Sequence, residues 1–256
     1  MRGRTLAYAV AGLVALAGWG RADEVAWHGR LSPGQTLEVK GVNGNIDATA
    51  AAEGEVRVTR RSRRSDAAAV EVKVVEHAGG VTICAVYPTP EGSAPNECVP
   101  GHGGRMNTRD NDVEVNFTVA VPAGARFVAR TVNGSVGAAS LSGDVDAHTV
   151  NGSVTVSTGG NVEAQTVNGA ISASAGRADW SGLADFRTVN GSITVALPAD
   201  TSAEVEAQTV NGEIVTDFPI SVQKLSRHSL HGTIGGGGRQ LRMQTVNGAV
   251  RLRKST

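Results

Sequence analysis

Hydrophobic and polar residues recur in a fixed order around a tetrapeptide that is repeated through the second half of the chain. The sequence Thr-Val-Asn-Gly begins at Thr131, Thr149, Thr166, Thr188, Thr209 and Thr245. A variant, Ser229-Leu230-His231-Gly232, and an early Val42-Asn43-Gly44 share its pattern. With the asparagine or its equivalent as origin, positions 133, 151, 168, 190, 211, 231 and 247 are 18, 17, 22, 21, 20 and 16 residues apart. Repeats of this length indicate a solenoid with one coil per repeat.

Two sets of aliphatic residues keep a constant distance from each origin. A β-branched residue stands three positions after it, at Ile46, Val136, Val154, Ile171, Ile193, Ile214, Ile234 and Val250. A second aliphatic residue stands just before it, at Val132, Val150, Val167, Val189, Val210, Leu230 and Val246. Because β-branched residues favour strands, stacked coils should bring both sets into the core as two apolar columns. We therefore predict an all-β fold, a parallel β-solenoid (β-helix) of 16–22-residue coils over residues 129–256.

The asparagine and glycine of each repeat are predicted to form structural turns. These residues are Asn43, Gly44, Asn133, Gly134, Asn151, Gly152, Asn168, Gly169, Asn190, Gly191, Asn211, Gly212, His231, Gly232, Asn247 and Gly248. At a corner, both residue types tolerate left-handed backbone angles, and the asparagine amides could stack into a ladder. Alternatively, the strand continues straight, with Thr, Asn and Ser facing outward. The corner is favoured because glycine packs nothing inside a strand. Arg251, Arg253 and Lys254 are expected to protect the open end of the solenoid.

Residues 23–128 are less regular, but they also alternate in the manner of strands. Such runs cover residues 55–58, 70–75, 81–87 and 113–121, and no amphipathic helix of normal length is present. Because Asn43 already carries the repeat signature, we expect this N-terminal β region to be the first, more elaborate part of the same solenoid.

Residues 1–22 have the pattern of a signal peptide. Arg2 and Arg4 precede an apolar stretch from Leu6 to Ala17, and small residues favour cleavage after Ala22. The alternative, a retained membrane anchor, is disfavoured because the stretch is shorter than the roughly 20 residues of a spanning helix. We expect export to the periplasm, the cell surface or the medium. In such oxidising compartments Cys84 and Cys98 should form a disulfide, which for a loop of this size contributes about 3 kcal/mol.

Charge narrows the range of partners. The 256 residues include 24 basic and 24 acidic side chains, a balance that disfavours nucleic acid as a partner. Loss of the first 22 residues removes three arginines and leaves 21 − 24 = −3. One basic cluster stands out, at Arg57, Arg60, Arg61, Arg63 and Arg64. It could contact an anionic membrane surface or polysaccharide, at about 1 kcal/mol per basic group, or simply keep a strand edge solvated.

The exported chain, the VTICAVYP segment followed by Cys98, and the serial TVNG-x-[VI] coils resemble the bacterial DUF4097 family, described as adhesins with a β-strand repeat. The resemblance covers roughly residues 35–256. It implies a β-solenoid at the cell envelope and transfers no catalytic residues.

The remaining polar residues do not form a recognisable site in the sequence. His228 and His231 need not share a face, so we predict neither a metal site nor a cofactor. Asp144 and Asp146 alternate on one strand, but we expect no third acid at the same phase in the next coil. We predict a non-enzymatic envelope or surface interaction scaffold whose partner is an unidentified envelope protein or polysaccharide. The alternatives are a polysaccharide lyase or glycoside hydrolase of the β-helix type, and an accessory of envelope-stress signalling.

Overall fold

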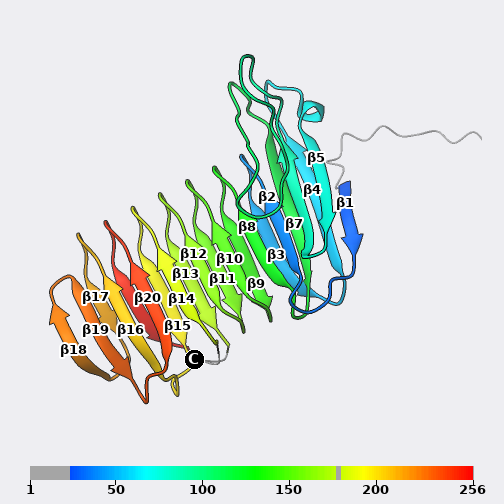
Figure 1. Ribbon diagram of the computed structural model, residues 1–256. Coiled ribbons are helices and arrows are strands. Elements are labelled where there is room, and N and C mark those ends of the chain that lie inside the picture. The colour runs from blue at the N-terminus through cyan, green and yellow to red at the C-terminus, as the bar shows by residue number, and fades with distance from the viewer. Residues whose placement is uncertain (1–23, 177–179, 256) are drawn as a thin grey trace, which may run out of the picture.

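A computed structural model describes residues 24–176 and 180–255, so the predicted signal peptide lies outside the described residues. Its strands stack side by side along one axis as two facing sheets (Figure 1). The described residues contain one helical turn, a 3-10 turn at Ala67–Ala69, and no helix long and apolar enough to cross a membrane. The all-β parallel solenoid predicted from the repeats is confirmed.

The first sheet, sheet A, has ten strands. In spatial order they are β1 (Glu24–Gly29), β4 (Gly54–Arg61), β7 (Glu114–Pro122), β3 (Ile46–Ala51), β9 (Val136–Leu141), β11 (Val154–Thr158), β13 (Ile171–Ala175), β15 (Ile193–Leu197), β21 (Val250–Lys254) and β17 (Ile214–Thr216). All neighbours pair in parallel except β1 with β4 and β4 with β7. Antiparallel strands therefore close the N-terminal end of this sheet.

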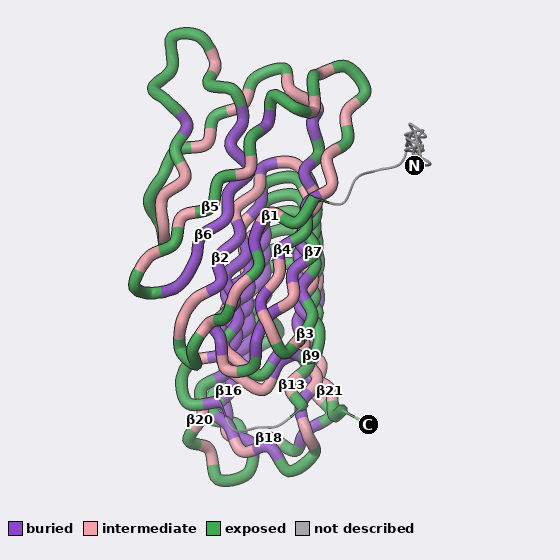
Figure 2. The backbone as a smooth tube through the Cα atoms, turned by 90° about the vertical axis from the view of Figure 1, so that its right-hand side faces the viewer, coloured by how far each residue is buried: buried purple, intermediate pink, exposed green. Residues whose placement is uncertain are grey.

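The second sheet, sheet B, has eleven strands. In spatial order they are β18 (Ile220–Ser226), β19 (Ser229–Ile234), β16 (Ala203–Gln208), β20 (Arg239–Gln244), β14 (Leu183–Arg187), β12 (Val162–Gln165), β10 (Val145–His148), β8 (Arg126–Arg130), β2 (Thr36–Lys40), β6 (Gly80–Val86) and β5 (Glu71–His77). Its ends are antiparallel, at β18–β19–β16 and at β5–β6. Each coil places one strand in each sheet, and the aliphatic side chains between the sheets form one continuous core. Buried residues recur along the stacked strands of both sheets (Figure 2).

Each coil turns from sheet B to sheet A at its Thr-Val-Asn-Gly sequence. Three positions later, the β-branched residues point into the core, and Ile171 is typical at 1% exposure. The valine before the asparagine does not, which corrects our expectation of a second apolar column. Five of these six valines are 38–39% exposed and Val210 is 58% exposed. The preceding threonines are buried instead, because each hydroxyl donates to a glycine carbonyl of the neighbouring coil, as Thr166 does to Gly152 at 2.8 Å.

The corner asparagines form a hydrogen-bonded ladder along the solenoid. The order is Asn43, Asn133, Asn151, Asn168, Asn190, Asn247 and Asn211, and each Nδ2 after that of Asn43 donates to the Oδ1 of the preceding asparagine at 2.8 Å. None of these asparagines has a left-handed backbone angle, contrary to our expectation. The glycine is required mainly by close stacking, since a Cβ on Gly152 would lie 2.0 Å from the carbonyl oxygen of Gly134.

The C-terminal coil is inserted out of sequence order. Strand β21 lies between β15 and β17, and β20 lies between β14 and β16. The coil of Asn247 therefore separates the coils of Asn190 and Asn211. Arg251, Arg253 and Lys254 consequently lie inside sheet A, and our expectation that they protect the open end is wrong. The coil of Asn211 and the β18–β19 hairpin form that end (Figure 1).

His231 and Gly232 do not form a repeat turn, which corrects our prediction. Both lie within β19, a strand that pairs antiparallel with β16 and β18. The sequence from Asn211 to Asn247 thus holds one coil step plus a hairpin rather than two coils. The sequence Ser229-Leu230-His231-Gly232 resembles the repeat because Leu230 and Ile234 are buried. Their burial is explained by the hairpin strand β19, so the same hydrophobic pattern arises without a coil.

The N-terminal region continues the same two sheets. Strands β2 and β3 flank Asn43 and pair in parallel with β8 and β9 of the next coil. Strands β6 and β7 extend the sheets by one further step. A disulfide joins Cys84 on β6 to Cys98 in the long segment before β7, with a Cα–Cα separation of 5.7 Å.

Candidate functional site

The outer face of sheet B carries the most regular array of charged side chains in the described residues. A carboxylate stands five positions before the ladder asparagine in five coils, at Glu38, Asp146, Glu163, Asp185 and Glu206. Two positions after each carboxylate comes a cation or an amide, at Lys40, His148, Gln165, Arg187 and Gln208. The other two coils carry Val128 with Arg130 and Arg242 with Gln244. We call these two rows the polar face.

Strand pairing brings the carboxylates of successive coils side by side. Glu163 lies directly between Asp146 and Asp185. Our expectation that no acid recurs at the phase of Asp146 is therefore wrong. The signal is present in the sequence as an acid-x-polar triplet immediately before most Thr-Val-Asn-Gly repeats, as in Glu163-Ala164-Gln165.

Like charges at adjacent strand positions repel, and each coil relieves this repulsion locally. Arg187 donates two hydrogen bonds to Asp185, at 2.7 and 3.1 Å. The Gln165 amide donates to Glu163, and the Gln208 amide to Glu206, both at 2.9 Å. Each acid is thus paired along its own strand, and a row of carboxylates runs along the solenoid beside a row of basic and amide side chains.

At its N-terminal end the polar face passes under the loop that the disulfide holds. A cleft of about 370 Å³ lies between this loop and strands β2, β8 and β10. Lys40 Nζ donates to the carbonyl oxygens of Val99, Gly101 and Gly103. The buried Glu38 carboxylate accepts from the Gly101 N–H at 2.8 Å and from the Thr82 hydroxyl at 2.9 Å. Together with Cys98, these contacts fix residues 98–103 over the outer face.

Asp146 forms the opposite wall of the cleft and is 5% exposed. Its carboxylate contacts the His148 imidazole and lies 3.0 Å from Arg130 Nη2 and 3.5 Å from Arg126 Nη2. Burial alone would raise the pKa of Asp146, but the contact with His148 and the charges of Arg130 and Arg126 outweigh it, so the pKa is lowered from 3.8. The group remains ionised near neutral pH and holds no proton for general-acid chemistry. Asp144, the other acid considered from the sequence, is exposed in the turn before β10 and accepts a hydrogen bond from the Asn161 N–H.

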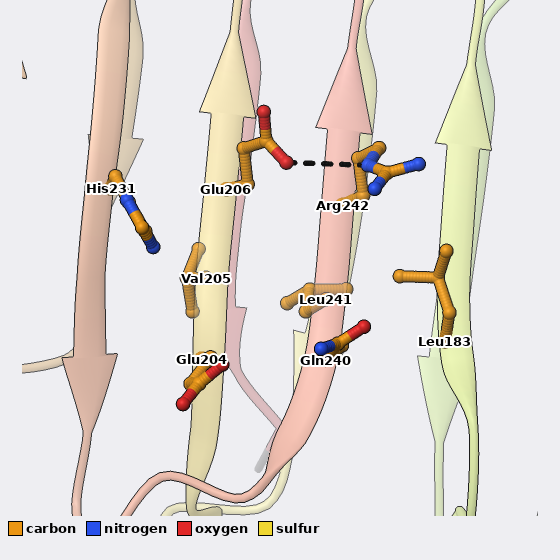
Figure 3. Close-up of a pocket in the computed structure, with 8 residues that line it drawn as sticks. All are labelled: Leu183, Glu204, Val205, Glu206, His231, Gln240, Leu241 and Arg242. Carbon is orange, nitrogen blue, oxygen red and sulfur yellow. Dashed lines mark hydrogen bonds and ion pairs between the residues drawn. The ribbon is translucent and has the colours of Figure 1, made fainter.

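The C-terminal end of the polar face holds a small pocket of about 120 Å³ (Figure 3). Glu206 of β16 forms an ion pair with Arg242 of β20 at 3.3 Å, and His231 of β19 lies beside them. Glu204 lies one step back along β16. His231, first interpreted as a turn residue, is therefore a neighbour of the carboxylates, whereas His228 lies in the turn of the hairpin. No group of three or more metal-ligating side chains is found in the part of the chain that the structure describes.

The arginine cluster lies at the N-terminal end, on β4 and the loop after it. Three of its five members form ion pairs, Arg57 with Glu55, Arg60 with Glu24, and Arg64 with Asp112 at 4.0 Å. The loop itself is shaped by one carboxylate, that of Asp112. Its hydrogen bonds to Ser65, and others from the same loop, hold the pKa of this carboxyl well below its usual range.

The backbone N–H groups of Arg63, Arg64 and Ser65 donate to Asp112 at 2.9–3.2 Å. The side chains of Arg61, at the end of β4, and of Arg63 and Arg64, in the loop, are exposed. The structure thus concentrates the predicted anionic-surface contact in these three residues, and contact with such a surface stays a prediction.

A parallel solenoid with a laddered corner and a repeated polar face belongs to the class of repeat proteins that present an extended surface instead of one deep pocket. The family model Toastrack DUF4097 matches residues 30–253, and the chain belongs to this family. The resemblance noted in the sequence is confirmed.

Two solved structures match this chain in the structural comparison. One is described as a "putative cell adhesion protein" from Clostridium sporogenes, with 9% identity and a TM-score of 0.49 over 92% of this chain and 100% of that chain. The other is a "putative adhesin" from Bacteroides fragilis, with 10% identity and a TM-score of 0.26 over 93% of this chain and 100% of that chain. No curated protein matches the sequence.

Proposed function

We propose that this chain is a non-enzymatic, exported interaction scaffold of the cell envelope, and that the polar face of sheet B is its contact surface. The observation that carries the proposal is the recurrence of paired carboxylate and amide or cationic side chains on successive coils. Extended surfaces of this kind are what solenoids use to bind partners. Export is supported by the basic and apolar pattern of residues 1–22, and the Cys84–Cys98 disulfide fits an oxidising compartment.

Fractionation of bacteria that express the full chain tests the export step. The expected result is a protein in the periplasm or medium whose N-terminus, read by mass spectrometry, is Asp23. An unprocessed chain in the cytoplasm would contradict the proposal.

Binding of the processed protein to washed envelopes of the source bacterium tests the surface. Glu163 and Gln165 lie at the centre of the polar face and are only partly buried, so Glu163→Lys with Gln165→Glu reverses the local charge pattern without disturbing the core. We expect at least a tenfold loss of bound protein. The matched control is Val150→Thr with Val167→Thr on the exposed corner, which should bind as the unchanged protein does. Equal binding by both variants would refute the polar face as the contact surface.

A polysaccharide-acting enzyme is the competing function, and Asp146 is the residue on which it would depend. A glycosidase needs a carboxyl group whose raised pKa keeps a proton for the leaving group. The pKa of Asp146 is shifted in the opposite direction by its basic neighbours. Screening against acidic polysaccharides provides the test, because turnover abolished by Asp146→Ala would replace the scaffold proposal with an enzyme.

A further inference from the structure

The β18–β19 hairpin interrupts the regular solenoid and creates a groove beside it. The groove has a volume of about 560 Å³ and lies between the hairpin turn and the ends of β14, β16 and β20. Insertions into a repeat array often form its binding surface. We call this feature the hairpin groove, and its volume is within the 300–1,000 Å³ usual for ligand sites.

The hairpin groove is lined by an arginine, a lysine and a histidine, and by no carboxylate. Arg187 of β14, Lys224 of β18 and His228 of the hairpin turn converge on it from three elements. Arg187 is paired with Asp185, but no described side chain forms an ion pair or hydrogen bond with the side chains of Lys224 or His228. The nearby acids Glu204 and Glu206 line the adjoining pocket of Figure 3 instead. The acids at this end of the polar face, Asp185 and Glu206, are paired with Arg187 and Arg242, and neither acid lines the groove.

Neutral donors and an apolar wall complete the groove. The side chains of Gln244 and Ser229 line it without a hydrogen-bond partner among the described residues, and that of Gln208 uses one N–H for Glu206. Val210 and Val246, which are 58% and 38% exposed, supply an apolar surface beside them. A ligand that fills this groove must therefore offer an anionic group, several hydrogen-bonding groups and some carbon surface.

We propose that the hairpin groove binds an acidic polysaccharide whose sugars carry carboxylate groups. A uronate carboxylate would pair with Lys224 and the imidazole of His228, because charged hydrogen bonds are the strong ones. Sugar hydroxyls would bond to Gln244 and Ser229, and the C–H face of a ring would lie against Val210. The inference rests on the proposed envelope scaffold, for which it names the partner class and the place of contact.

Calorimetric titration of the processed protein with tetragalacturonate, a chain of four uronate sugars, tests the proposal. We expect measurable binding that weakens as salt rises, and no binding of neutral maltotetraose. Lys224→Glu should weaken binding at least tenfold, and Lys224→Gln by a smaller factor. Arg109→Glu, the same change to a negative charge at an exposed residue of the segment before β7, at the other end of the solenoid, should change the affinity by less than twofold. All variants should share one urea unfolding midpoint, because Lys224 is exposed.

Three outcomes would overturn the proposal. One is no binding of tetragalacturonate, and another is equal binding by Lys224→Glu and the unchanged protein. The third is loss of tetragalacturonate binding in Arg109→Glu to the same extent, because the attraction would then depend on overall charge. Envelope binding measured on the same preparations separates the two proposals. If Lys224→Glu still binds envelopes and no variant binds tetragalacturonate, the scaffold stands and the saccharide site is wrong.

Discussion

At the corner of each coil the threonine is buried and the valine is exposed, the reverse of what their hydrophobicity predicts. Exchanging the two residue types tests this arrangement through the free energy of unfolding. Thr166 is 5% exposed, and its Oγ1 donates to the Gly152 carbonyl oxygen at 2.8 Å. Thr166→Val keeps the shape of the side chain and removes the hydroxyl, so a buried carbonyl loses its partner. A buried group left unsatisfied costs about 1–3 kcal/mol, and we expect the free energy of unfolding to fall by that amount.

Val167→Thr is the matched control because it makes the reverse exchange at the next residue. Val167 is 38% exposed, so the added hydroxyl meets water and the free energy of unfolding should change by less than about 0.5 kcal/mol. Urea titration followed by far-ultraviolet circular dichroism gives both values. If Val167→Thr costs as much as Thr166→Val, or if Thr166→Val is neutral, valine faces the core and the corner described above is wrong.

Three further predictions concern coil stacking, the disulfide and acid. Gly152→Ala should destabilise the protein by about 1–3 kcal/mol, because the added Cβ would lie 2.0 Å from the Gly134 carbonyl oxygen. Gly236→Ala is the control: a Cβ at this position would have no atom within 4 Å, so the same urea titration should show almost no change in stability. Replacing Cys84 and Cys98 with serine should cost about 3 kcal/mol and should speed tryptic cleavage after Arg105, read by mass spectrometry; an unchanged cleavage rate would show that the disulfide does not hold the loop. Because the pKa of Asp146 is lower in the folded protein than its value near 3.8 in the unfolded chain, the ionised carboxylate stabilises the fold at neutral pH. This contribution is lost as the pH falls below about 3.8. The free energy of unfolding of Asp146→Asn, which lacks the carboxylate, should therefore fall less between pH 5 and 3 than that of the unchanged protein.

Spacing in the sequence was enough to predict the coils, because hydrophobic pattern and hydrogen bonding agree there. The β-branched residue after each origin lies in the core, and the asparagine amides lie on one line. The orientation of Thr166 and Val167 could not be obtained in this way. Hydrophobicity alone assigns valine to the core, whereas the corner leaves one glycine carbonyl per coil that only a threonine hydroxyl can reach.

The order of the coils was hidden from the sequence for a different reason. Every coil presents the same amide ladder and the same β-branched column to its neighbour, so any coil can stack on any other. The register of β21 against β15 is as regular as that of β15 against β13. Sequence proximity therefore predicts the coil but not its neighbour, and the chain places its last coil inside the array.

The regular and irregular parts of the polar face imply different kinds of binding. An exposed ion pair contributes only about 0–1 kcal/mol, so a partner lying along the central coils must gather small contributions from several of them. The ends are different because insertions there build enclosed volume. Ninety residues separate Asn43 from Asn133, and thirty-six separate Asn211 from Asn247, against 17–22 elsewhere. The first insertion carries the disulfide loop and its cleft, and the second carries the hairpin and its groove. In the proposed scaffold the central coils would supply length and orientation, and the insertions would supply the selective contacts. A single substitution in the hairpin groove should therefore have the largest effect on binding.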